Sequence, residues 1–126
     1  MNINEYQEDL EILQGCKDTC SKYTEQLEFE MMLVSSLVKE NNENQELLRL
    51  QVKVNDRYFI NQEMLRLLDV VMNYLKTEKN EDETYHNYID KYEVLVERFL
   101  KISKDSDFKD LANKYMPRTL EEIKTL

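Results

Sequence analysis

The sequence predicts an all-α protein: an antiparallel three-helix bundle or long helical hairpin with coiled-coil character, followed by one or two short C-terminal helices. Two observations support this fold class. The 126 residues include one glycine and one proline, and turns between β-strands depend largely on these residues and asparagine. Apolar residues also recur every three or four positions, which is the period of a packed α-helix. A chain of this length is expected to form a single helical domain over residues 1–126.

The first helix is predicted over residues 3–40, where a heptad pattern begins at Ile3. Most of the seam positions are apolar, which indicates coiled-coil-like packing. The apolar stripe widens after Leu27, and a wider stripe indicates more than one neighbouring helix. Gly15 permits a bend. The seam positions are Ile3, Tyr6, Leu10, Leu13, Lys17, Cys20, Thr24, Leu27, Met31, Val34 and Val38.

A second helix is predicted over residues 45–78, after a break marked by Asn41, Asn42 and Asn44. Asparagine favours turns and the first capping position of a helix. Two interpretations of this segment are open. Either one helix runs through with Asn61 in its seam, or the β-branched and aromatic residues of 52–59 interrupt it and Asn61 caps a new helix. We favour the continuous helix.

A third helix is predicted over residues 83–104, after the charged loop 77–83. Short helices are expected over 107–116, ending before a proline, and over 119–125, opening with a Thr-x-x-Glu capping box. The third helix has the most aromatic seam of the chain. Its seam positions are Tyr85, Tyr88, Tyr92, Leu95, Phe99 and Ile102.

The chain is acidic, with 26 acidic and 17 basic residues and a net charge of −9. A negative field repels phosphate, so no direct nucleic-acid binding is expected. No apolar stretch approaches the roughly 20 residues that cross a bilayer, so no membrane insertion is expected. The N-terminal residues are polar and acidic, unlike an export signal, and with two cysteines a reducing, cytoplasmic location is expected.

The residues that carry chemistry are few, and no catalysis, cofactor or metal is predicted. Cys16, Cys20 and the one histidine, His86, cannot provide the four ligands of a zinc site without carboxylates. Acids such as those of 25–30 and 78–83 have the spacing of Glu-x-x-Glu motifs in all-α pyrophosphohydrolases that bind magnesium. Those enzymes need a second acidic pair on a facing helix, which the sequence does not show. An all-α metal-dependent hydrolase is therefore a remote alternative.

The predicted function is that of a small acidic protein-binding module, a regulator, adaptor or inhibitor that presents helix surfaces to a protein partner. Tyrosine suits such surfaces because it joins an apolar ring to a polar tip. The alternatives are that the rings are ordinary bundle core, and that the chain is a structural coiled-coil assembly protein. The candidate partner-binding residues are Ile3, Tyr6, Leu10, Leu13, Tyr85, Tyr88 and Tyr92.

A homodimer is expected through the first helix. At 1.5 Å per residue this helix is about 57 Å long and the third helix about 33 Å. The shorter helix would leave the N-terminal part of the first helix uncovered, although its heptad continues to Ile3. A second copy would cover these side chains. Alternatively, a bend at Gly15 would fold them onto the chain's own bundle.

Helical segments separated by polar loops, with Tyr92 and Glu93 near the end of the third segment, resemble the three-helix GAT domains that bind ubiquitin and sorting proteins. The resemblance covers residues 30–100. It lies in the order of helices and loops rather than in a diagnostic motif, so no residue role is carried over from that family.

Overall fold

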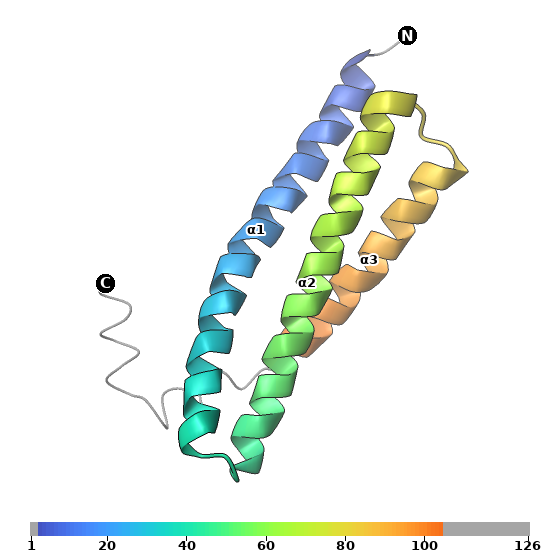
Figure 1. Ribbon diagram of the computed structural model, residues 1–126. Coiled ribbons are helices and arrows are strands. Elements are labelled where there is room, and N and C mark those ends of the chain that lie inside the picture. The colour runs from blue at the N-terminus through green and yellow to red at the C-terminus, as the bar shows by residue number, and fades with distance from the viewer. Residues whose placement is uncertain (1–2, 105–126) are drawn as a thin grey trace.

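The computed structural model describes residues 3–104, and the side chains from residue 6 onward. These residues form three helices, α1 (Ile3–Glu40), α2 (Gln45–Glu78) and α3 (Glu83–Lys104), and the described range contains no strand (Figure 1). The predicted all-α class and three-helix bundle are confirmed. The short helices predicted over 107–116 and 119–125 lie outside the described residues.

The turn between α1 and α2 is built by asparagine side chains. Asn41 donates its side-chain amide to the carbonyl of Leu37 at 3.0 Å and so closes the last turn of α1. Asn44 caps α2, because its side-chain oxygen accepts the backbone N–H of Leu47 at 3.2 Å. An Asn cap of this kind stabilises a helix start by roughly 1 kcal/mol, which explains why the break falls at this point.

The turn between α2 and α3 is fixed by a left-handed residue and an aspartate. Lys79 has φ 49° and donates its backbone N–H to the carbonyl of Leu75 at 3.1 Å, which ends α2. Asp82 accepts the backbone N–H of Tyr85 at 3.2 Å and so caps α3. Its other oxygen accepts the hydroxyl of Tyr74 at 2.7 Å. Asp82 therefore ties the start of α3 to the end of α2.

The helix α2 is continuous, so the alternative in which residues 52–59 interrupt it is wrong. Val52 and Phe59 point outward and are exposed. Asn61 is fully buried in the middle of α2, and its side-chain amide donates to the carbonyl of Cys20 at 3.0 Å and to the hydroxyl of Thr24 at 2.8 Å. Because α1 provides these acceptors, the amide nitrogen is satisfied inside the bundle, while the side-chain oxygen of Asn61 is buried without a hydrogen-bond partner. Asn61 therefore joins α2 to α1 and does not cap a helix.

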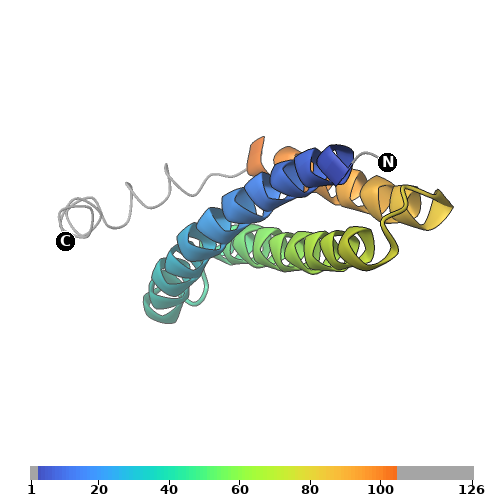
Figure 2. The ribbon, with the colours of Figure 1, turned by 90° about the horizontal axis from the view of Figure 1, so that it is seen from above.

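The central element is α2, which packs against α1 on one side and α3 on the other (Figures 1 and 2). All three helices contribute to the main core, and a smaller core of Val34, Leu50 and Val54 lies in the half of the α1–α2 hairpin near its turn. The buried residues of the main core are Leu13, Cys20, Leu27, Met64, Leu68, Val71, Met72, Leu75, Tyr85 and Phe99.

The shorter helix α3 begins where α2 ends and runs back along α2, at the level of the N-terminal half of α1 (Figure 1). The N-terminal half of α1 is therefore covered by α2 and also meets side chains of α3, and it is the half near Glu40 that α3 does not reach. This differs from the expectation that the N-terminal part would be left uncovered. The helix α1 also runs without interruption through Gly15, so no break in the helix is needed to cover that part.

A buried ion pair lies where α3 ends. Arg57 of α2 donates to a carboxylate oxygen of Glu30 of α1 at 3.2 Å, and both side chains are buried. Arg57 also donates to the hydroxyl of Ser103 at 3.2 Å, and its guanidinium lies 5.6 Å from the ring centre of Phe99. One side chain of α2 thus contacts both other helices, which fixes the end of α3 in place.

Candidate functional site

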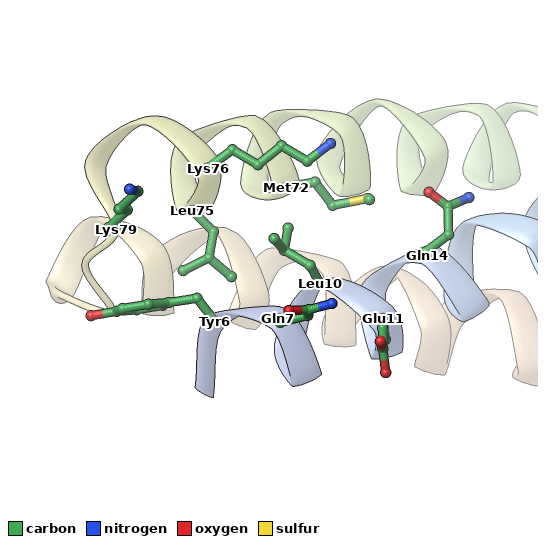
Figure 3. Close-up of a pocket in the computed structure, with 9 residues that line it drawn as sticks. All are labelled: Tyr6, Gln7, Leu10, Glu11, Gln14, Met72, Leu75, Lys76 and Lys79. Carbon is green, nitrogen blue, oxygen red and sulfur yellow. The ribbon is translucent and has the colours of Figure 1, made fainter. Parts of the chain in front are cut away.

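A groove opens between the N-terminal end of α1 and the C-terminal end of α2, on the side away from α3 (Figure 3). Its volume is about 570 Å³. The residues that line it are Tyr6, Gln7, Leu10, Glu11 and Gln14 of α1 and Met72, Leu75, Lys76 and Lys79 of α2.

The floor of this groove is apolar. Leu75 and Met72 are buried members of the main core, and Tyr6 and Leu10 are half-buried against them. In Figure 3 the side chains of Leu10 and Leu75 point into the space between the two helices, and the ring of Tyr6 lies at the open end. The groove therefore follows the seam between α1 and α2, at a level where the seam lacks a third helix on this side.

The edges of the groove are polar and of opposite charge. Lys76 and Lys79 lie on the α2 edge and Glu11 lies on the α1 edge, and all three residues are exposed (Figure 3). One turn further along both helices, Lys17 and Asp69 form an ion pair at 2.7 Å that joins α1 to α2. This exposed pair contributes little stability, but it bridges the two helices and marks the inner end of the groove.

The apolar floor continues along α2 beyond the groove. Tyr58 and Leu65 stand fourteen and seven residues before Met72, and seven residues are close to two full helical turns, so the three side chains share one face of the helix. Tyr58 and Leu65 are half-buried and pack against the main core. We call the groove together with Tyr58 and Leu65 the open face.

The structure places the residues of α1 that were predicted to bind a partner in different surroundings. Tyr6 and Leu10 line the groove. Leu13 is 5% exposed and is part of the main core, and the side chain of Ile3 lies outside the described residues. Leu13 is therefore satisfied by the chain's own fold.

The tyrosine seam of α3 points into the bundle. Tyr85 is 8% exposed, and Tyr88 and Tyr92 are half-buried against the main core. The ring of Tyr88 meets the ring of Tyr74 edge to face, with centres 6.2 Å apart. These tyrosines cover α1 and α2 in the way the bundle-core alternative expects.

The sequence reasoning missed the α2 half of the groove: Met72, Leu75, Lys76 and Lys79. Leu75 stands two heptads after Asn61 and so lies at a seam position of α2, but heptad periodicity does not say which turn of α1 it meets. The antiparallel order of the helices was the available signal, since it brings the end of α2 to the start of α1.

The two cysteines have no features of a reactive pair. Cys16 and Cys20 are both free thiols, and the hydroxyl of Tyr92 lies within hydrogen-bonding reach of both. Burial raises the pKa of the Cys20 thiol and also that of the Tyr92 hydroxyl. A raised pKa keeps a thiol protonated, whereas a nucleophilic cysteine needs the thiolate.

In each acidic cluster singled out in the sequence, one acid has a structural partner. Glu30 pairs with Arg57, and Asp82 caps α3. Within residues 3–104, no three or more His, Cys, Asp or Glu side chains gather in a way that could hold a metal ion. His86 is exposed, with its ring 5.4 Å from that of Tyr85.

Among α1, α2 and α3, no helix combines the length and apolar character that crossing a membrane requires. Comparisons with family models, with curated proteins and with solved structures find no match to this chain.

Proposed function

We propose that this chain is a non-catalytic protein-binding module whose open face receives an amphipathic helix. The observation that supports this most directly is the groove of about 570 Å³ with its apolar floor of Tyr6, Leu10, Met72 and Leu75. Of these four residues, Tyr6 and Leu10 are only half-covered by their own fold, and such apolar side chains gain stability when a partner excludes water from them. A regulator, adaptor or inhibitor would act through such a surface.

The length of the groove fits a short stretch of helix. Its α1 wall runs from Tyr6 to Gln14, which is about 12 Å at 1.5 Å per residue, or roughly two helical turns. Helices that bind in grooves use apolar residues spaced three, four and seven positions apart, which also span about two turns. The expected ligand is therefore a helix with two or three apolar residues on one face.

The alternative of a coiled-coil assembly protein is less well supported. In such a protein the heptad seam of α1 would be available to other chains. Here that seam packs against α2 of the same chain, with Leu13, Cys20 and Leu27 buried in the main core. A metal-dependent hydrolase gains no support from the acidic residues of residues 3–104, since Glu30 and Asp82 are engaged in structural contacts.

The proposal includes a cytoplasmic setting. Both cysteines are free and stand one turn apart on α1, and free thiols are usual where the surroundings are reducing. Localisation of a tagged chain by microscopy, compared with the same chain carrying an export signal, tests this part separately.

The test of partner binding uses one substitution inside the groove and one matched control. Leu10→Glu places a charge on the apolar floor, while Ile12→Glu makes the same kind of change two residues away, at a side chain that is 65% exposed and does not line the groove. Affinity capture with quantitative mass spectrometry is carried out from cells that express the chain. A partner retained by the wild type and by Ile12→Glu is expected to be reduced at least tenfold with Leu10→Glu.

A second variant separates lost binding from lost folding. Lys76→Glu changes an exposed residue at the rim, so its circular dichroism and melting temperature should match those of the wild type while capture of the same partner weakens. Equal capture by all variants would place the partner on another surface and overturn the proposal.

A further inference from the structure

The open face carries its charges on its two opposite edges. Glu11 lies on the α1 edge, and Lys76 and Lys79 lie on the α2 edge; all three residues line the groove and are exposed. In Figure 3 Glu11 and Lys76 lie at opposite sides of the groove, with the apolar floor between them. An occupant of this face therefore meets acid on one side and base on the other.

A second copy of the chain has the matching arrangement. Consider a half-turn about an axis that runs parallel to the helices and in front of the open face. This rotation keeps each residue at the same position along the axis and exchanges the α1 side with the α2 side. The α1 edge of one copy then faces the α2 edge of the other. Glu11 meets Lys76 and Lys79 of the second copy, and the same contact occurs twice, as an isologous interface requires.

The apolar residues between the two edges also meet under this symmetry. Because α1 of each copy faces α2 of the other, Tyr6 and Leu10 of one copy are brought opposite Met72 of the other, and Tyr58 and Leu65 of α2 extend the contact toward the middle of the hairpin. The result is a four-helix arrangement of two α1–α2 hairpins, with α3 on the outer side of each.

The area available predicts a weak dimer. From Tyr58 to Lys76 the open face is about 27 Å long, and two helices side by side are about 20 Å wide. Each copy would cover roughly 500 Å², or roughly 1,000 Å² in total, which is at the low end of specific interfaces. Dissociation constants in the micromolar range are expected, and they should rise with salt because exposed ion pairs are screened.

We propose that the open face binds a second copy of this chain, with Glu11 of each α1 paired to Lys76 and Lys79 of the other copy's α2. This inference rests on the proposed function, because it names the occupant of the same surface. A foreign helix and the second copy would then compete for one site.

The test exchanges the charges of one edge at a time. One variant carries Lys76→Glu and Lys79→Glu, and the other carries Glu11→Lys. Each variant alone sets like charges against each other, so its dissociation constant by sedimentation equilibrium should rise at least tenfold over the wild type. Mixed in equal amounts, the two variants again set acid against base, and the mixture should dimerise with an affinity close to that of the wild type.

A control on α3 makes the same change of charge away from the proposed interface. Lys91→Glu with Lys101→Glu alters two exposed lysines and should leave the dissociation constant within twofold of the wild type. All three variants are compared by circular dichroism to establish that they are folded.

Two results would overturn self-association through this face. One is a wild type that sediments as a monomer up to a few hundred micromolar. The other is a dimer whose dissociation constant is the same in the wild type and in both charge-exchange variants. Neither result would contradict the broader proposal if Leu10→Glu still abolishes capture of a foreign partner. The two proposals therefore fail in distinguishable ways.

Discussion

The two faces of the α1–α2 hairpin are built differently, although the same heptad seam runs between them. On the covered face, α3 supplies Tyr85 and Phe99 to the main core, and Arg57 and Glu30 form an ion pair near its end. On the open face Met72 and Leu75 are buried, but Tyr6, Leu10, Tyr58 and Leu65 stay half-buried. The seam predicts that two helices pair, whereas the residues beside the seam decide how many further neighbours each side needs.

The largest effect is expected where the covered face is broken. Phe99 is 3% exposed, and its ring centre lies 5.0 Å from that of Tyr23 on α1. Phe99→Ala should lower the free energy of unfolding by about 3–5 kcal/mol, because it removes a buried ring and leaves a cavity. The neighbouring Leu100 is 52% exposed, so Leu100→Ala should cost under about 0.5 kcal/mol. Urea unfolding of both variants measures the difference; similar losses would mean that α3 does not bury the face containing Phe99.

A smaller effect is expected from the ion pair on the covered face. Arg57→Met leaves Glu30 buried without its partner and should cost about 3 kcal/mol at neutral pH. The control is Arg66→Met in the exposed pair with Glu63 on the same helix, which should cost no more than about 1 kcal/mol.

The cost of Arg57→Met should also depend on pH. Burial raises the pKa of the Glu30 carboxyl, and Arg57 opposes that rise. A carboxyl whose pKa is higher in the folded state gains stability as the pH falls, and the gain is complete below its unfolded pKa of about 4.3. Without Arg57 the gain is larger, so the loss should shrink between pH 7 and pH 4 in urea unfolding. A loss that grows on acidification would mean that Glu30 stays ionised.

The smallest effect is expected at a residue that belongs to neither face. A Cβ atom added at Gly15 would have no neighbour within 4 Å, and α1 is helical on both sides of it. Gly15→Ala should therefore raise the free energy of unfolding by about 0.5–1 kcal/mol, since alanine favours the helix over glycine. The melting temperature reports this gain. A decrease would indicate that α1 needs the freedom of glycine at this point.

Much of the fold was predictable because periodicity and turn chemistry act locally. The heptads give the helices, the asparagines at 41–44 give the first turn, and the scarcity of glycine and proline excludes a sheet-rich fold. The continuous α2 was also favoured. Asn61 can stay inside this helix because Thr24 and Cys20 of α1 accept hydrogen bonds from its side-chain amide. That reason is tertiary and was not visible in α2 itself.

The candidate site was predicted only in part. Tyr6 and Leu10 were named from the α1 heptad, and they do line the groove. Lys76 and Lys79 complete it through the relative alignment of two helices, which a repeating pattern leaves undetermined. The tyrosines of α3 were named for their chemistry. They are buried because α3 packs at the level of the N-terminal half of α1, and periodicity does not predict on which side of the hairpin α3 packs.

The buried amide of Asn61 has a consequence for how the hairpin reaches its native alignment. A seven-residue repeat allows α1 to slide along α2 by one heptad and still match apolar residues to apolar residues. Such a slide would replace Thr24 by Lys17 or Met31 opposite Asn61, and neither side chain offers the hydroxyl oxygen that accepts the amide. A buried polar group without its partner costs roughly 1–3 kcal/mol. Asn61 thus penalises the misaligned hairpins that the heptads alone would tolerate, and it narrows the set of compact states through which the chain can fold.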